Sequence, residues 1–282
     1  MEEQPHFEKV IYDFGMNEGL NIDYYLKKGF PVVGVEANPL LCKEVASEFS
    51  MAIKSGQLRI ENCALSNSSS SELVDFYIHK FHSVLSQFPQ PALCDIHNFN
   101  PIKIKQRKAS DIIKQYGEPY YIKIDIEHYD HVILLDLFAN NIKPPYLSSE
   151  IHKVDVFAIL LAMGYETFNL VDGPSIDIRY RNIKIETATG IQPFSFKTHS
   201  AGPFGVDLKT PWLEKNDFNL LLIKHKLGWK DVHATTVIPS DRTIQIKLVD
   251  LVSFSEHVKA LWPSFLRAVN FRLLKKSTEK FL

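Results

Sequence analysis

A short turn at residues 13–19, with the sequence DFGMNEG, most strongly constrains the fold of this chain. An apolar run at 10–12 precedes the turn and a helix-like stretch at 20–28 follows it, so the turn joins a predicted strand to a predicted helix. In α/β proteins the carboxyl end of such a strand is a place where a cofactor binds. Gly15 and Gly19 allow the backbone to turn sharply and to approach a ligand without an intervening Cβ.

An acidic residue, Glu36, follows the next apolar run at residues 32–35. An acid at the tip of the second strand can accept hydrogen bonds from both ribose hydroxyls of an adenosine group. The turn lacks the G-x-G-x-x-G pattern of pyrophosphate binding, and its two carboxylates, Asp13 and Glu18, would repel a diphosphate. This combination favours S-adenosylmethionine, which carries an ammonium and a sulfonium and contains no phosphate.

Four motifs along the chain resemble, in order, those of the FkbM family of S-adenosylmethionine-dependent methyltransferases. They are D-x-G-x-N-x-G at residues 13–19, V-E-x-N-P at 35–39, N-C-A-L-S at 62–66 and I-K-I-D-I-E at 122–127. The resemblance covers about residues 10–151. It implies an enzyme that methylates a hydroxyl group of a sugar, a glycan or a small natural product. His128 departs from the family pattern, which usually has glycine directly after the glutamate of the fourth motif.

The motifs predict a set of cofactor contacts at the carboxyl ends of the strands. We expect Asp13 to bind the cofactor ammonium or the amides of the turn, with capping of the next helix as the alternative. Asn17 would bind near the methionine carboxylate, or would simply tolerate a left-handed turn. The contact of Ala64 with the adenine is implied by the resemblance alone. The predicted cofactor-binding residues are Asp13, Gly15, Asn17, Gly19, Glu36, Ala64 and Asp125.

Three residues are predicted to be catalytic: Asp125, His128 and His152. Asp125 ends the central strand, where a carboxylate can face both cofactor and substrate. Histidine titrates near neutral pH and can take a proton from a hydroxyl during methyl transfer. The alternative role for Asp125 and its neighbour Glu127 is capping of the following helix.

A metal site is a further possibility at the same strand ends, where five oxygen and imidazole ligands could converge. Such ligands suit magnesium, manganese or zinc. The family resemblance does not imply a metal, so the predicted site includes none. The five residues are Asp125, Glu127, His128, Glu150 and His152.

Strand and helix signals alternate along the first half of the chain, which predicts a mostly parallel sheet covered on both faces. We expect a Rossmann-like class I methyltransferase fold with seven strands, the last of them antiparallel. The predicted strands are residues 9–14, 31–36, 58–62, 120–126, 145–151, 165–171 and 219–224. Alternating segments at 73–79 and 102–108 predict two further strands outside the parallel set.

The expected organisation is a methyltransferase domain at residues 1–227 and a C-terminal extension at 228–282. Residues 172–218 form an insertion that is long for a connection in a compact domain. We interpret it as a substrate lid, with an ordinary surface elaboration as the alternative. A predicted helix at 254–274 is basic and amphipathic, so it could contact an anionic membrane or pack on its own domain.

The net charge of −1 argues against nucleic acid as a partner, so a small molecule or glycan is the expected acceptor. Three scattered cysteines favour a reducing compartment. The chain shows neither an apolar signal core at its start nor a run of roughly 20 apolar residues, so we expect a cytoplasmic protein. Two other functions remain open: an NAD-dependent oxidoreductase and a non-catalytic interaction module.

Overall fold

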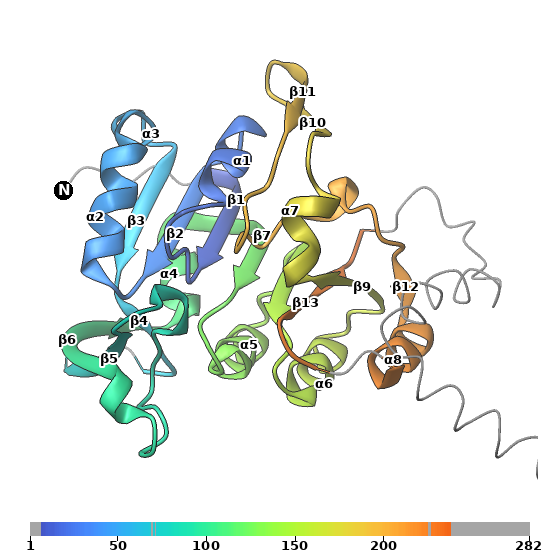
Figure 1. Ribbon diagram of the computed structural model, residues 1–282. Coiled ribbons are helices and arrows are strands. Elements are labelled where there is room, and N and C mark those ends of the chain that lie inside the picture. The colour runs from blue at the N-terminus through green and yellow to red at the C-terminus, as the bar shows by residue number, and fades with distance from the viewer. Residues whose placement is uncertain (1–6, 69, 71, 225–226, 238–282) are drawn as a thin grey trace, which may run out of the picture. The chain divides into compact units, whose positions relative to one another are not determined.

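An eight-stranded sheet, in the order β12-β9-β13-β8-β7-β1-β2-β3, forms the centre of the fold (Figure 1). The computed structural model describes residues 7–68, 70, 72–224 and 227–237. The strands of the sheet are β1 (Phe7–Phe14), β2 (Val32–Glu36), β3 (Leu58–Asn62), β7 (Gly117–Ile124), β8 (Tyr146–Glu150), β9 (Thr167–Asp172), β12 (Leu213–Glu214) and β13 (Lys230–Thr235).

The strand directions are those of a Rossmann-like methyltransferase fold. Strands β3, β2, β1, β7 and β8 are parallel neighbours, and β13 lies antiparallel between β8 and β9. The order reverses at β1, because the chain first builds outward to β3 and later continues from β7 on the other side of β1. Such a reversal opens a crevice at the carboxyl ends of the strands, where ligands bind in α/β sheets.

Helices cover both faces of the sheet, and alternate residues of β1 show which helix packs where. Ile11 belongs to a core cluster with Tyr24 of α1 and Tyr180, which directly follows α7. The next residue, Tyr12, points to the opposite face, where its hydroxyl donates a 2.7 Å hydrogen bond to Gly117 O after α4. The helices are α1 (Ile22–Lys27), α2 (Pro39–Glu48), α3 (Ser50–Lys54), α4 (Ala109–Tyr116), α5 (Asp130–Ala139), α6 (Val154–Ala162), α7 (Ile176–Arg179) and α8 (Lys215–Lys224).

Two small sheets accompany the central one. Strands β4 (Ala64–Leu65), β6 (Phe99–Arg107) and β5 (Leu73–His79) form a three-stranded sheet, whose buried face includes Phe76 and Ile104. This confirms the two strands predicted outside the parallel set. A hairpin of β10 (Ile183–Thr187) and β11 (Gly190–Phe194) projects from the insertion (Figure 1).

The fold class predicted from the sequence is confirmed, but the position of the antiparallel strand was wrong. Residues 219–224 lie in helix α8, and β13 takes the antiparallel place in the sheet. The sheet therefore includes residues on the C-terminal side of the domain boundary expected after residue 227. The short strand β12 brings the number of strands to eight rather than seven.

The insertion at 172–218 packs closely on the first helix of the domain. Phe196 and Phe204 are buried in the same core cluster as Tyr24. Asp207 accepts hydrogen bonds from the Tyr24 hydroxyl and from Lys28 Nζ, at 2.6 and 2.7 Å. The helix predicted at 254–274 lies outside the described residues. Within the described part of the chain, no helix is long and apolar enough to cross a membrane.

Candidate functional site

A cleft of about 740 Å³ lies at the carboxyl ends of β1, β2, β7 and β8. Each of these strands contributes an acidic residue at its end: Asp13, Glu36, Asp125 and Glu150. The small sheet, through Ala64 and Phe76, and insertion residues 197–199 and 201 complete the lining. The crevice expected from the strand order is therefore present, and its lining includes an acidic residue from each of the four strands.

The first turn fits tightly against the end of β7. Gly15 has φ +81°, and a Cβ on it would lie 1.8 Å from the carbonyl oxygen of Asp125, so only glycine fits. The amides of Gly15 and Met16 both donate to Val35 O, at 2.9 and 3.0 Å, which fixes the turn to β2. Gly19 does not line the cleft, and its positive φ of +69° shapes the end of the turn.

Glu36 lies at the end of β2 and holds the first turn in place. Its Oε2 accepts a 3.0 Å hydrogen bond from the amide of Asn17, and its Oε1 accepts a 2.7 Å bond from the amide of Asn38. Burial raises the pKa of Glu36, and these backbone hydrogen bonds oppose that rise. Each carboxylate oxygen keeps a second acceptor position, so two further donors, such as ribose hydroxyls, can be bound.

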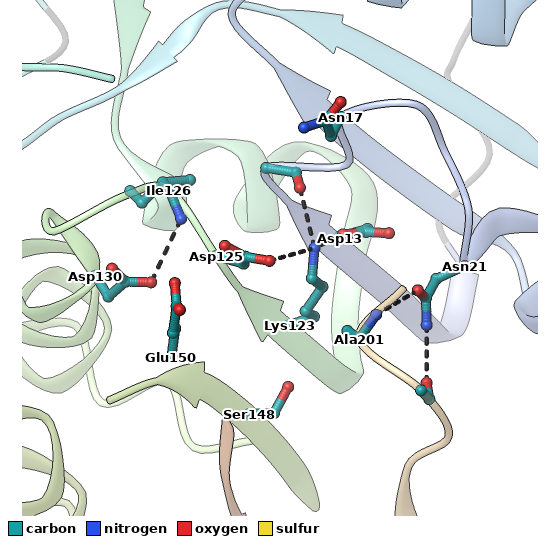
Figure 2. A network of polar contacts seen from close by, with 12 residues as sticks. Asp13, Asn17, Asn21, Lys123, Asp125, Ile126, Asp130, Ser148, Glu150 and Ala201 are labelled. Atoms are coloured by element: carbon teal, nitrogen blue, oxygen red, sulfur yellow. Dashed lines mark hydrogen bonds and ion pairs between the residues drawn. The ribbon is translucent and has the colours of Figure 1, made fainter. Parts of the chain in front are cut away.

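Lys123 is a central residue of the site that the sequence did not single out. Its Nζ lies 3.1 Å from Oδ1 of Asp13 and 3.4 Å from Oδ2 of Asp125, and it donates a 3.0 Å hydrogen bond to Gly15 O (Figure 2). Burial acts to lower the pKa of Lys123, but the two carboxylates outweigh it and raise the pKa above its usual value. The lysine therefore stays charged and ties β7 to the first turn.

Asp13 is consequently committed to Lys123 inside the protein. It is 1% exposed, and the N-cap of α1 is Asn21, so Asp13 does not cap that helix. Burial raises the pKa of Asp13, and Lys123 opposes the rise. The lysine of the fourth motif was the available signal for this pair, because a charged residue inside an apolar strand needs a partner.

The turn after β7 has an unusual backbone. Glu127 and His128 both have left-handed conformations, with φ +50° and +67°. A left-handed residue is most easily a glycine, which explains why glycine is expected at the position of His128. Tyr129 is the N-cap of α5, so Asp125 and Glu127 do not cap that helix. The side chain of His128 lines the cleft, and its ring lies 4.4 Å from that of His152.

Carboxylates crowd together below this turn. Burial and the charge of Asp125 raise the pKa values of Glu127 and Glu150 to about 8 each. Asp130 and Asp231 are also buried, and burial raises their pKa values well above the usual range. Figure 2 shows Asp125, Asp130 and Glu150 converging on the same space. The site therefore gathers several carboxyl groups whose charged forms are disfavoured by burial and by one another.

The insertion reaches the cleft through a segment anchored by Asn21. The Asn21 side chain donates a 2.8 Å hydrogen bond to Gly202 O and accepts a 2.9 Å bond from the Ala201 amide (Figure 2). The neighbouring His199 stacks on Trp229 at a ring distance of 5.3 Å, and both line the cleft. Trp229, which precedes β13, was not predicted as a site residue.

The structure brings most of the predicted site residues together. Burial and the adjacent His152 lower the pKa of His128, which is the more exposed of the two histidines. Ala64 is 2% exposed at the base of the cleft. The predicted residues that line it are Asp13, Gly15, Asn17, Glu36, Ala64, Asp125, His128 and His152.

Comparisons with known proteins give likenesses to solved structures. No family model and no curated protein matches the sequence. A precorrin-6y C5,15-methyltransferase from Geobacter metallireducens is 9% identical, with 81% of this chain and 80% of that chain covered and a TM-score of 0.36. A precorrin-8W decarboxylase from Methanobacterium thermoautotrophicum is 8% identical, with 83% and 85% covered and a TM-score of 0.34.

A third solved structure, described as a candidate RNA methyltransferase from Pyrococcus horikoshii, is 11% identical. The match covers 81% of this chain and 75% of that chain, with a TM-score of 0.32. At such identities a likeness concerns the fold alone. The fold is therefore assigned from the strand order and the antiparallel β13 described above.

Proposed function

We propose that this protein is an S-adenosylmethionine-dependent methyltransferase. The observation that carries the proposal is the arrangement of Glu36 at the cleft. Its carboxylate is held rigidly by two backbone amides and has acceptor positions left for two ribose hydroxyls. The first turn, with Gly15 and Asn17, lines the cleft beside it.

The charge of the cleft supports the same cofactor. S-adenosylmethionine brings an ammonium and a sulfonium, and the ends of β7 and β8 bring the carboxylates of Asp125 and Glu150 to the cleft. A nicotinamide dinucleotide would bring a diphosphate into the same acidic surroundings, which is electrostatically unfavourable. The positive ligand is therefore preferred over the negative one.

We further propose that the acceptor is a hydroxyl of a sugar, a glycan or a small natural product, as the resemblance to the FkbM family implies. The acceptor oxygen forms a bond to the methyl carbon as the carbon–sulfur bond breaks, and the bonding pair goes to sulfur to give a neutral thioether. A cleft residue takes the hydroxyl proton; Asp125, His128 and His152 line the cleft and are the candidates. Holding the two reactants in line supplies much of the rate enhancement.

Insertion residues 197–201 support the proposal that this segment acts as the substrate lid. Lys197, Thr198 and His199 line the cleft, and His199 stacks on Trp229. Aromatic faces and hydroxyl-binding side chains together suit a polar ring such as a sugar.

Calorimetry with S-adenosylhomocysteine tests the cofactor. Glu36→Gln replaces a charged acceptor of two ribose hydrogen bonds, each worth about 1.5–3 kcal/mol when a charged group is involved. We expect the affinity to fall at least about tenfold. The control is Glu44→Gln, an exposed change on α2, which should leave the dissociation constant unchanged.

The other functions predict different results. An oxidoreductase would bind NADH more tightly than S-adenosylhomocysteine. A non-catalytic module would give no thioether product with any acceptor in a panel of sugars, nucleotide sugars and glycans, measured by mass spectrometry. An unchanged affinity of Glu36→Gln would contradict the assigned ribose contact.

A further inference from the structure

Five side chains with metal-binding atoms meet on one side of the cleft. They come from the turn after β7 and from the end of β8, two segments that the parallel sheet places side by side. The ligand atoms of Glu127, His128 and His152 lie within 4.8 Å of one another, and so do those of Asp125, Glu127 and Glu150. Glu127 belongs to both groups, so the two sets adjoin.

Glu150 is buried within this cluster and lies beside one of its two imidazoles. Its side chain is 6% exposed, and its carboxylate is within ion-pair distance of His152. Nε2 of His152 lies 2.8 Å from Oε2 of Glu150, and it is buried with no hydrogen bond to the described residues. At this separation both atoms could contact one ion.

Two further buried carboxyl groups lie next to the cluster. Asp130 and Asp231 are buried beside the cluster, and Asp231 is the register partner of Glu150 across β13 and β8. Lys123 acts to lower the pKa values of Glu150 and Asp231, but it is already engaged by Asp13, Asp125 and Gly15 O. Buried carboxylates of this kind are normally paired or bound to a metal ion.

We propose that Glu127, Glu150, His128 and His152, with Asp125 beside them, bind a divalent metal ion in the cleft. The two imidazoles distinguish a metal from an amine, because a neutral imidazole coordinates a metal ion but does not neutralise an ammonium group. A mixed set of imidazole and carboxylate ligands favours Mn²⁺, Fe²⁺ or Zn²⁺ over Ca²⁺. The prediction from the sequence, which left a metal out, followed the family resemblance rather than these contacts.

The backbone of the turn agrees with this assignment. Glu127 and His128 are consecutive residues in left-handed conformations, which residues with a Cβ rarely adopt. Such strained residues cluster at ligand-binding sites, where the surrounding structure holds them. Here the strained turn brings both side chains to the cleft.

A metal at this position deepens the proposed function and rests on it. The ion would bind the acceptor oxygen beside the cofactor and lower the pKa of its hydroxyl, as a Lewis acid does. His128 and His152 would then be metal ligands instead of general bases.

Titration of the chelator-treated full-length protein with MnCl₂ tests the site. We expect calorimetry to give one equivalent of bound Mn²⁺, and we expect His152→Ala and Glu150→Gln each to weaken binding at least tenfold. The matched controls are His97→Ala and Glu118→Gln, the same changes at exposed positions outside the cleft, which should bind as the wild type does.

A second measurement uses the unaltered protein, so it does not depend on whether the variants fold. Electron spin-echo modulation of bound Mn²⁺ should show coupling to imidazole ¹⁴N. Absence of saturable Mn²⁺ binding, equal affinity in the folded variants, or absence of ¹⁴N coupling would each overturn the site. Binding of S-adenosylhomocysteine is measured separately. If S-adenosylhomocysteine binds and Mn²⁺ does not, only the metal proposal fails. If Mn²⁺ binds and S-adenosylhomocysteine does not, the proposed function fails.

Discussion

His128 occupies a backbone conformation that glycine adopts more easily than any residue with a side chain. Its φ of +67° costs about 1–2 kcal/mol for an L-residue. A histidine kept at this position, with its ring in the cleft beside His152, is best explained by a role for the imidazole.

The variant His128→Gly separates the effect of the backbone conformation on stability from the effect of the imidazole on turnover. Relief of the left-handed strain should leave the free energy of unfolding unchanged or raise it by about 1 kcal/mol, because the extra freedom of glycine in the unfolded chain offsets part of the gain. Turnover should fall by at least about 100-fold, because the imidazole is lost either as a proton acceptor or as a ligand of the proposed metal ion. Urea unfolding and a thioether-release assay measure the two effects.

Asn141→Gly provides the matched control for this change. Asn141 is exposed and also has a positive φ, of +55°, but it does not line the cleft. Its replacement should alter stability by a similar amount and leave turnover unchanged. If His128→Gly retains full activity, His128 is an ordinary turn residue, and the proton acceptor is Asp125, His152 or a residue of the insertion.

At the level of whole elements, Phe204 is a central contact between the insertion and the sheet. Phe204 is 4% exposed and stacks on Tyr121 of β7 at a ring distance of 4.2 Å. Its ring also contacts Tyr24 and Tyr25 of α1. The insertion therefore shares the core of the domain, and only its cleft-facing segment at 197–201 is available to act as a lid.

Phe204→Ala should destabilise the whole domain because it removes this shared core. Truncation of a buried phenylalanine costs about 3–5 kcal/mol. We expect one cooperative transition in urea with a lower midpoint. Val206→Ala is the control, since Val206 is 80% exposed and its truncation should change the midpoint little. A separate early transition, or no loss of stability, would show that the insertion folds independently of the sheet.

The strands of the central sheet were not equally predictable: those with apolar runs were found, and β13 was not. Residues 219–224 form an apolar run, yet in α8 Leu220 and Ile223 are 57% and 73% exposed. Strand β13, in contrast, lies between two strands and buries Asp231 and His233. Periodicity of apolar residues alone cannot separate a short helix from a strand, and it gives no signal for a strand that buries charge.

The same physical reason limits what the sequence reveals of the site. The acids at strand ends and the glycines of the first turn follow from the motif spacing. Lys123 and Glu150 are charged residues in buried strands, and their importance depends on contacts between segments far apart in the sequence. Local departures from the usual hydrophobic pattern are expected where a fold carries its function.

At the scale of the whole molecule, buried aspartates and a buried histidine change the pH dependence of the free energy of unfolding in opposite directions. Asp130 and Asp231 have raised pKa values, so near neutral pH they favour proton uptake in the folded state. His233, in the centre of β13, has the reverse behaviour: burial lowers its pKa to about 3. Its Nε2 is buried and makes no hydrogen bond within the described structure, so it must stay neutral in the folded protein.

His233→Gln isolates the contribution of this histidine. Between pH 6.5, the usual value for histidine, and about pH 3, the unfolded chain binds a proton at this position and the folded protein does not. Wild-type stability should therefore fall, relative to the variant, by about 1.4 kcal/mol for each pH unit below 6.5. Urea unfolding of both proteins at pH 8 and pH 5 should show the wild type losing about 2 kcal/mol more than the variant. His97→Gln, at an exposed position, is the control. The stability difference between wild type and His233→Gln could instead be the same at both pH values. That result would mean that His233 is charged, or bound to a donor, inside the folded protein.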